Sequence, residues 1–368
     1  MKQKPAPGRT ILSLQYLRAI AALLVVYFHA ELQAPGRAVA FPSFGAAGVD
    51  IFFVLSGYVM WLTTSGRQLG PLQFMQRRII RIVPLYWLIS LVAVGFSLTA
   101  PGIMRSTKFE PTHFLASLFF IPWPNPASAT HQTQVLTPLL VPGWTLNMEM
   151  FFYLLFALLL PFGVRWRLMG LMLMICVAFI IGTFFAGRNT PLSFYGTTLL
   201  FEFWFGMVLA AVVGKQSDSP ILIPHIGQTV IFAMLWLAAL TALLLADWYN
   251  AGEPKMIWYG LPALSVVGIA ILAERRGLVA CLPWLQTLGD ASYSLYLTHG
   301  FVVAACRVLF AQLPFLSSID HPLPFIGIVI MGSILVGLAT YFLVEKPLTL
   351  FVGQFASRKG QPTITATA

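Results

Sequence analysis

Charged residues are scarce in this sequence. Asp, Glu, Lys and Arg make up only 9% of the 368 residues, whereas 58% are hydrophobic and the mean hydropathy is +0.82. A soluble domain needs considerably more charge to solvate its surface. The scarcity therefore excludes an ordinary soluble protein and indicates that lipid surrounds much of the chain.

Cysteine and acidic residues are also few. Cys176, Cys281 and Cys306 stand far apart within apolar stretches, which indicates neither a disulfide framework nor a metal site. Only 12 Asp and Glu residues accompany 22 Lys and Arg residues, which gives a formal net charge of +10. A nucleic-acid-binding surface would gather such charge on one patch or stripe. Here the basic residues lie between apolar runs, so we predict no nucleic-acid partner.

Apolar stretches of roughly bilayer length recur along the chain. They lie at about 11–30, 45–64, 82–99, 143–162, 168–186, 192–213, 226–246, 257–273, 290–310 and 325–344. In lipid the backbone has to satisfy its own hydrogen bonds, which a helix does within one segment. We therefore predict an all-α integral membrane protein, a bundle of about ten transmembrane helices. Residues 1–355 would form the membrane domain and residues 356–368 a short polar cytoplasmic tail.

The distribution of Lys and Arg predicts the orientation. The first stretch imitates a secretory signal, but Arg18 interrupts it and it is longer than the apolar core of a signal, so we interpret it as a retained helix. An even number of spans then puts both termini on one side. Only six of the 22 basic residues fall on the other side, namely Arg37, Arg105, Lys108, Arg188, Lys255 and Arg307. By the positive-inside rule both termini are cytoplasmic.

Ionisable side chains inside apolar spans are costly in hydrocarbon, so each is a functional candidate. Arg18 and His29 lie eleven positions apart in the first span, which on a helix is about three full turns and about 16 Å, so both share one face. Together they could hold opposite ends of a long, anionic, thioester-bearing donor. Alternatively, Arg18 reaches the lipid headgroups and His29 bonds a neighbouring carbonyl.

Two acids belong to the same leaflet as His29. Asp50 begins the second span and Glu149 lies early in the fourth. A carboxylate there could orient the His29 imidazole, as the acid of a triad does. Asp50 could equally satisfy the free amides at the start of its helix. The sequence leaves both interpretations of Asp50 open.

A pair of arginines stands before the third span. Arg78 and Arg81 are three positions apart, so on a helix they face the same way and could clamp phosphates on the cytoplasmic side. Ordinary topogenic charge is the alternative. In the ninth span, His299 is a second intramembrane imidazole, which the hydroxyls around it could hold in a structural role.

At these positions the sequence resembles the acyltransferase 3 family of membrane O-acyltransferases, and within it the exopolysaccharide acetyltransferase branch. The resemblance rests on Arg18 followed after ten residues by His29, and on the segments Gly48–Tyr58, Arg78–Arg81, Trp144–Tyr153 and Ser292–His299. It implies acyl-CoA as the donor, with Arg18, Arg78 and Arg81 near it and His29 at the reaction centre. Five further residues become candidates to line the substrate pocket: Tyr58, Trp144, Ser292, Tyr296 and His299.

We therefore expect a multi-pass enzyme of the plasma (bacterial inner) membrane. It would move an acyl group, by the resemblance acetyl, from cytoplasmic acyl-CoA to a hydroxyl of a cell-surface or lipid-linked glycan on the outer side. His29, Asp50 and Glu149 are the catalytic candidates, with His29 a general base or a transient acyl carrier, and no metal is expected. Polysaccharide biosynthesis proteins are candidate partners. The rival hypothesis is a secondary transporter whose buried charges line a path, although no repeated halves are seen on inspection.

Overall fold

The computed structural model describes residues 11–35, 44–66, 69–128, 135–187, 189–213, 225–249, 254–313 and 321–357. This part of the chain is built from helices and contains no named strand. The elements are α1 (Leu12–Glu31), η1 (Phe44–Ala46), α2 (Ala47–Thr64), α3 (Pro71–Thr99), α4 (Pro111–Leu118), η2 (Val141–Gly143), α5 (Trp144–Leu159), α6 (Val164–Ile180), η3 (Ile181–Phe185), α7 (Pro191–Phe194), α8 (Leu200–Val213), α9 (His225–Trp248), η4 (Met256–Gly260), α10 (Leu261–Arg275), α11 (Pro283–Asp290), α12 (Ser292–Gln312), α14 (Pro322–Thr340), η5 (Tyr341–Glu345) and α15 (Lys346–Ser357).

The prediction of an all-α, multi-pass membrane protein is confirmed. Within the described ranges, eight helical segments are long and apolar enough to cross a bilayer. They are Leu12–Glu31, Ala47–Thr64, Pro71–Thr99, Val164–Phe185, Thr229–Ala246, Met256–Arg275, Ser292–Gln312 and Pro322–Phe355. The two other predicted spans are helical as well, but α5 and α8 have only 16 and 14 residues, short of the roughly 20 that a bilayer requires.

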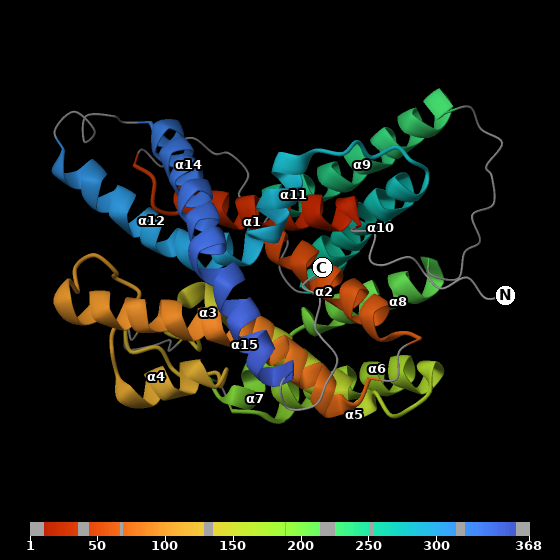
Figure 1. Cartoon of the computed structure of the whole chain (residues 1–368), viewed down its shortest axis with the longest axis horizontal. Coiled ribbons are helices and arrows are strands. Elements are labelled where there is room, and N and C mark those ends of the chain that lie inside the picture. The colour runs from red at the N-terminus through yellow and green to blue at the C-terminus, as the bar shows by residue number, and fades with distance from the viewer. Residues whose placement is uncertain are drawn as a thin grey trace.

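The last helix is longer than the sequence predicts. The expected span ends at residue 344, whereas the helix continues through η5 and α15 to Ser357. Figure 1 shows α14 and α15 as one long blue rod that crosses the bundle, and α15 packs against α3. Pro347 would interrupt an ordinary helix, and the π-helical turn of η5 directly before it changes the hydrogen-bond register. The predicted tail at 358–368 lies outside the described residues.

Hydrogen bonds at the two ends of α1 define the two sides of the bundle. At its start, the backbone N–H groups of Leu12 and Ser13 donate to the Glu274 carboxylate at 2.9 and 2.8 Å, so the end of α10 caps α1. Near its other end, Arg307 of α12 reaches both Gln33 and the Ile103 carbonyl, at 3.4 and 2.6 Å. The loops that the charge count assigned to one side therefore lie together.

Glycines allow α2 and α8 to pack backbone to backbone. A Cβ on Gly57 would lie 1.9 Å from the Phe203 carbonyl oxygen, and a Cβ on Gly206 would lie 1.9 Å from the Val54 carbonyl oxygen. Small residues at such crossings are typical of membrane bundles, where close packing replaces the hydrophobic effect between helices. This contact holds α2, which carries Asp50, Ser56 and Tyr58, in the middle of the bundle.

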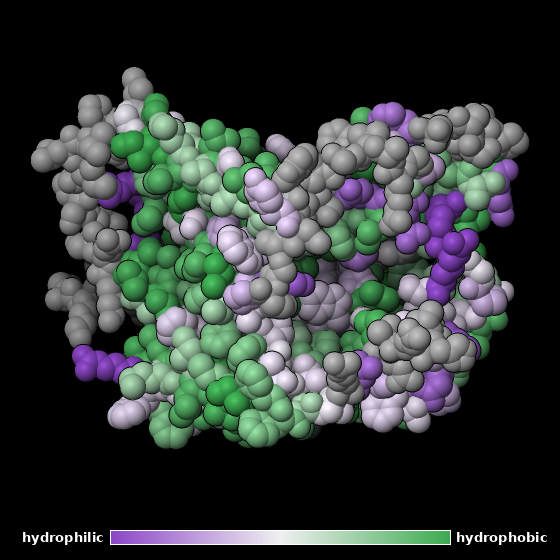
Figure 2. Space-filling view, turned by 180° about the vertical axis from the view of Figure 1, so that it is seen from behind, coloured by the Kyte–Doolittle hydropathy of each residue, from purple (hydrophilic) through white to green (hydrophobic). Residues whose placement is uncertain are grey.

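The long connection between α3 and α5 folds back along α3. The indole N–H of Trp87 donates to the Leu118 carbonyl at 2.9 Å, and the rings of Tyr86 and Phe120 stack with centroids 4.9 Å apart. Figure 1 shows α4 beside α3. On the opposite face of the molecule, green apolar side chains cover much of the described surface, and the strongly hydrophilic ones lie mainly towards the two sides of the view (Figure 2). Such a surface is expected where lipid surrounds the middle of the bundle.

Candidate active site

A cavity of about 240 Å³ lies where α1, α2, α3, α5 and α12 meet. Its walls are largely apolar, and each of the five helices adds polar or charged side chains. These are Gln15 and Arg18 from α1, Ser56 and Thr63 from α2, Arg78 and Arg81 from α3, Thr145, Glu149 and Tyr153 from α5, and Ser292, Tyr293 and Tyr296 from α12. The cavity therefore gathers residues from all five sequence motifs that carry the family resemblance, although Arg18 lines it and His29 does not.

All three predicted donor-binding arginines line this cavity. Arg78 lies over the rings of Phe74 and Tyr153, 5.4 and 5.2 Å from their centroids, and its Nη2 donates to the Thr63 hydroxyl at 3.3 Å. The aromatic faces hold the guanidinium in place by cation–π contacts. Neighbouring Arg77 is exposed and does not line the cavity. Arg78 and Arg81, three positions apart, therefore share the helix face that lines the cavity, whereas Arg77 faces outwards.

Glu149 lies in the cavity as an acceptor of two hydroxyl groups. Ser56 donates to its Oε1 at 2.9 Å, and Tyr153 donates to the same oxygen. Tyr153 also lies under the Arg78 guanidinium, so the carboxylate and this arginine share a neighbour. The hydrogen bonds of His29 go to Val25 and His299, so the structure brings Glu149 to the arginines and not to the imidazole.

His29 and His299 form a pair beyond the end of the cavity. His29 Nδ1 lies 2.9 Å from the Val25 carbonyl oxygen and 3.3 Å from His299 Nε2. The two ring centroids are 4.9 Å apart. Tyr296 joins this pair to the cavity, because its ring lines the cavity and its centroid is 6.0 Å from that of His299. The sequence predicted both imidazoles as site residues but not their contact, which joins α1 to α12.

Asp50 lies apart from His29. Its carboxyl lies close to the Glu202 carboxyl of α8, and both residues are buried. Two carboxyl groups buried side by side disfavour two negative charges, so the pair is not fully ionised. The prediction that Asp50 orients His29 finds no contact here, because the hydrogen bonds of His29 go to Val25 and His299.

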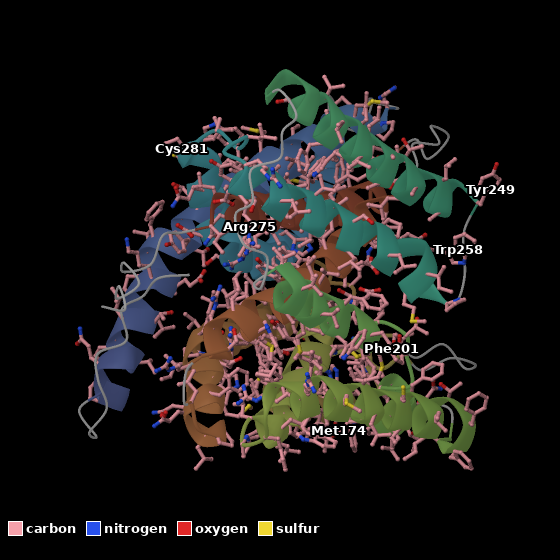
Figure 3. The ribbon with its side chains drawn as sticks, turned by 90° about the vertical axis from the view of Figure 1, so that its right-hand side faces the viewer. Met174, Phe201, Tyr249, Trp258, Arg275 and Cys281 are labelled. Atoms are coloured by element: carbon pink, nitrogen blue, oxygen red, sulfur yellow. The ribbon has the colours of Figure 1, made fainter. Side chains whose placement is uncertain are left out.

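The pocket candidates divide into two groups. Ser292 and Tyr296 line the cavity, and the Tyr296 hydroxyl is 2.7 Å from the Thr145 hydroxyl and donates to the Pro142 carbonyl at 2.7 Å. Tyr58 does not line it and instead lies near Arg275, which is labelled on α10 in Figure 3. Trp144 packs edge-on against Phe53, with centroids 6.5 Å apart.

One acid near Arg18 and Arg81 was not among the residues predicted from the sequence. Glu345, the last residue of η5, accepts a hydrogen bond of 2.5 Å from the Ser294 hydroxyl and lies within electrostatic reach of Arg18 and Arg81. Asp290, at the end of α11, faces the same two arginines, and partial burial raises the pKa of that carboxyl. An acid that directly follows the last apolar run was the available signal for Glu345.

Comparisons with known proteins identify the family of this chain. The model of the acyltransferase 3 family, an acyltransferase domain, matches residues 11–342. The chain is 35% identical over 309 residues to the exopolysaccharide production protein ExoZ of Rhizobium meliloti, covering 83% of this chain and 89% of that protein. It is 28% identical to the acyltransferase MdmB of Streptomyces mycarofaciens, over 79% of this chain and 78% of that one.

A more distant relative is the peptidoglycan O-acetyltransferase OatA of Listeria monocytogenes, 26% identical over 78% of this chain. The chain spans about half of that longer protein, 48% of its length. No solved structure matches the chain. The family match covers the cavity and both histidines. This multi-pass membrane protein therefore belongs to the acyltransferase 3 family and is an acyltransferase.

Proposed function

We propose that this protein transfers an acetyl group from cytoplasmic acetyl-CoA to a hydroxyl of a glycan on the outer side of the membrane. The observation that carries the proposal is the cavity, which has Arg18, Arg78 and Arg81 in its walls and ends near the His29–His299 pair. Phosphates need cationic donors, and a thioester carbon needs a base or nucleophile beside it. One elongated donor meets both requirements.

The distance along α1 suits such a donor. Arg18 and His29 are eleven residues apart, which corresponds to about 16 Å of helix. With the phosphates of acetyl-CoA at the arginines, the pantetheine arm would follow the apolar wall of the cavity, past Phe52 and Tyr296, towards His29. The donor would then reach across the membrane while its nucleotide stays on the cytoplasmic side.

His29 would carry the chemistry. As a general base it would take the proton of the acceptor hydroxyl while that oxygen attacks the thioester, and as a nucleophile it would hold the acetyl group first. Glu149 would act on the donor side, because its hydroxyl partners Ser56 and Tyr153 keep it beside Arg78. Asp50 would support the bundle, since its carboxyl pairs with Glu202.

The acceptor is proposed from the relatives. One is named an exopolysaccharide production protein and another a peptidoglycan O-acetyltransferase. Both names concern cell-surface polysaccharide, so we propose a surface or lipid-linked glycan, made with polysaccharide biosynthesis partners. We place the protein in the bacterial inner membrane with both termini in the cytoplasm. His29 then lies in the outer half of the bilayer, on the side where such a glycan is found. C-terminal reporter fusions that score as extracytoplasmic would overturn this orientation.

Two measurements test the transfer itself. The purified chain in lipid nanodiscs should release CoA from acetyl-CoA when a de-O-acetylated oligosaccharide from the exopolysaccharide of its own cell is added. Mass analysis of that polysaccharide should show acetyl groups in the parent strain, none in a deletion strain, and their return on complementation. Identical acetylation in all three strains would exclude this glycan as the acceptor.

A further inference from the structure

The hydrogen bonds of the imidazole pair define which nitrogen of each ring carries a proton. His299 Nδ1 lies 2.7 Å from the Tyr296 carbonyl oxygen. A carbonyl oxygen can only accept, so Nδ1 carries the proton and Nε2 of the neutral ring has a free electron pair. That Nε2 is the atom 3.3 Å from His29 Nδ1.

The same reasoning determines the tautomer of His29. Its Nδ1 faces two acceptors, the Val25 carbonyl oxygen at 2.9 Å and His299 Nε2 at 3.3 Å. Both contacts require a proton on Nδ1, so the electron pair of neutral His29 is on Nε2. In the part of the chain that the structure describes, no residue hydrogen-bonds to His29 Nε2. This nitrogen is therefore available to a substrate.

We propose that His299 is the proton acceptor behind His29, so that the two imidazoles work as a relay in the place where a triad has a carboxylate. The proposal rests on the proposed function. When the acceptor hydroxyl attacks the thioester carbon, its O–H bond breaks and an N–H bond forms at His29 Nε2. At the same time the Nδ1 proton of His29 moves to His299 Nε2. His29 stays neutral, and the positive charge lies on His299.

Both protons return to their starting positions when the thioester breaks. The C–S bond cleaves, the acetyl group stays on the glycan oxygen, and the CoA thiolate takes the proton from His29 Nε2 while Nδ1 recovers its own from His299. Val25 cannot replace His299, because a backbone carbonyl accepts a hydrogen bond but does not take the proton. The Tyr296 carbonyl oxygen, 2.7 Å from His299 Nδ1, faces the positive charge that forms on this buried ring.

The test counts protons in the transition state. The full chain in nanodiscs is assayed with acetyl-CoA and a poor oligosaccharide acceptor, so that acyl transfer limits the rate, in water with increasing deuterium content. Two moving protons give a curved dependence of rate on deuterium fraction, and one proton gives a straight line. We expect curvature for the unchanged protein. A straight line there would overturn the relay without any variant.

His299→Gln supplies the matched change, because its amide oxygen can accept from His29 Nδ1 but cannot take a proton. We expect turnover to fall at least about tenfold, donor KM to stay unchanged, and the deuterium dependence to become linear. The control His321→Gln changes an exposed histidine that caps α14 and should behave as the unchanged protein.

Turnover of His299→Gln within twofold of the unchanged protein, or a deuterium dependence that stays curved in this variant, would overturn the relay. Loss of turnover in His29→Asn alone would leave the proposed function standing, whereas unchanged turnover in both variants would remove His29 from it.

Discussion

Two buried polar regions of this molecule, the cavity and the Asp50–Glu202 pair, differ in what their charges face. In the cavity, Arg18, Arg78 and Glu149 border about 240 Å³ of open space. Asp50 and Glu202 face each other, and Gly260 packs so tightly on Glu202 that a Cβ there would lie 2.9 Å from the Glu202 Cγ. The first region can admit a ligand, and the second is closed by its own helices.

It follows that a buried charged residue in a membrane domain indicates catalysis only when a second criterion is also met. Every ionisable residue in a span is a candidate because hydrocarbon penalises it. A retained proton lowers that penalty without any substrate, as two acids buried side by side at Asp50 and Glu202 illustrate. A binding residue differs from a structural one because open space lies beside its charge. A reacting residue also needs a free lone pair.

The largest effect should come from the reacting nitrogen. Changing His29 to Asn leaves a side chain that can hydrogen-bond but cannot take a proton at neutral pH. We expect turnover to fall by at least about 10²-fold, the low end for a missing acid–base group, with donor binding unchanged. Turnover of the purified variant and its binding of acetyl-CoA are the two measurements. Near-normal turnover would mean that another residue of the cavity carries the chemistry, and a free lone pair would no longer identify the reacting residue.

The next effect concerns the arginines. Arg78→Ala or Arg81→Ala should each remove a charge-assisted phosphate contact of about 1.5–3 kcal/mol and raise the KM for acetyl-CoA roughly 10- to 100-fold. Turnover at saturating donor should change little. Arg77→Ala is the matched control, because Arg77 is exposed on the same helix and faces away from the cavity. Equal KM values for all three variants would reduce Arg78 and Arg81 to topogenic charges.

Much of this arrangement could be predicted from the sequence. Apolar runs and their length predict helices, and the spacing of Arg78 and Arg81 placed both on one helix face that lines the cavity. These are local properties of one segment, for which the period of the helix is sufficient. The position of α1 with Arg18 at one end and His29 towards the other follows from the same period.

The remaining features depend on contacts between segments. The His29–His299 pair joins residues 270 positions apart, and the Asp50–Glu202 pair depends on how Gly57 and Gly206 bring α2 against α8. No spacing in a single chain reveals such crossings. The sequence placed Asp50 in the first turn of its helix, but nothing in it indicated that Glu202 of α8 lies beside it.

A smaller effect, of opposite sign to that of the arginines, should follow from Glu345. Its carboxylate faces Arg18 and Arg81, the charges that the donor phosphates would need. Glu345→Gln keeps an acceptor for the Ser294 hydroxyl and removes the competing negative charge. We expect the KM for acetyl-CoA to fall by up to roughly fivefold, as for an ion pair of up to about 1 kcal/mol. An increase in KM would mean that Glu345 positions the arginines for the donor.

The smallest effect on catalysis is expected at the closed acid pair. Asp50→Asn should keep turnover within about threefold, because the amide is a polar side chain of the same shape and adds no charge beside Glu202. Asp50→Leu leaves the buried Glu202 carboxyl beside an apolar side chain, at a cost of about 1–3 kcal/mol in folding free energy. The measurements are turnover and thermal stability in nanodiscs, where Asp50→Leu should melt at a clearly lower temperature and Asp50→Asn close to the unchanged protein. If Asp50→Asn instead lost turnover as His29→Asn does while its melting temperature stayed the same, Asp50 would act on the reaction after all. Burial away from the cavity would then not be enough to exclude an acid from catalysis.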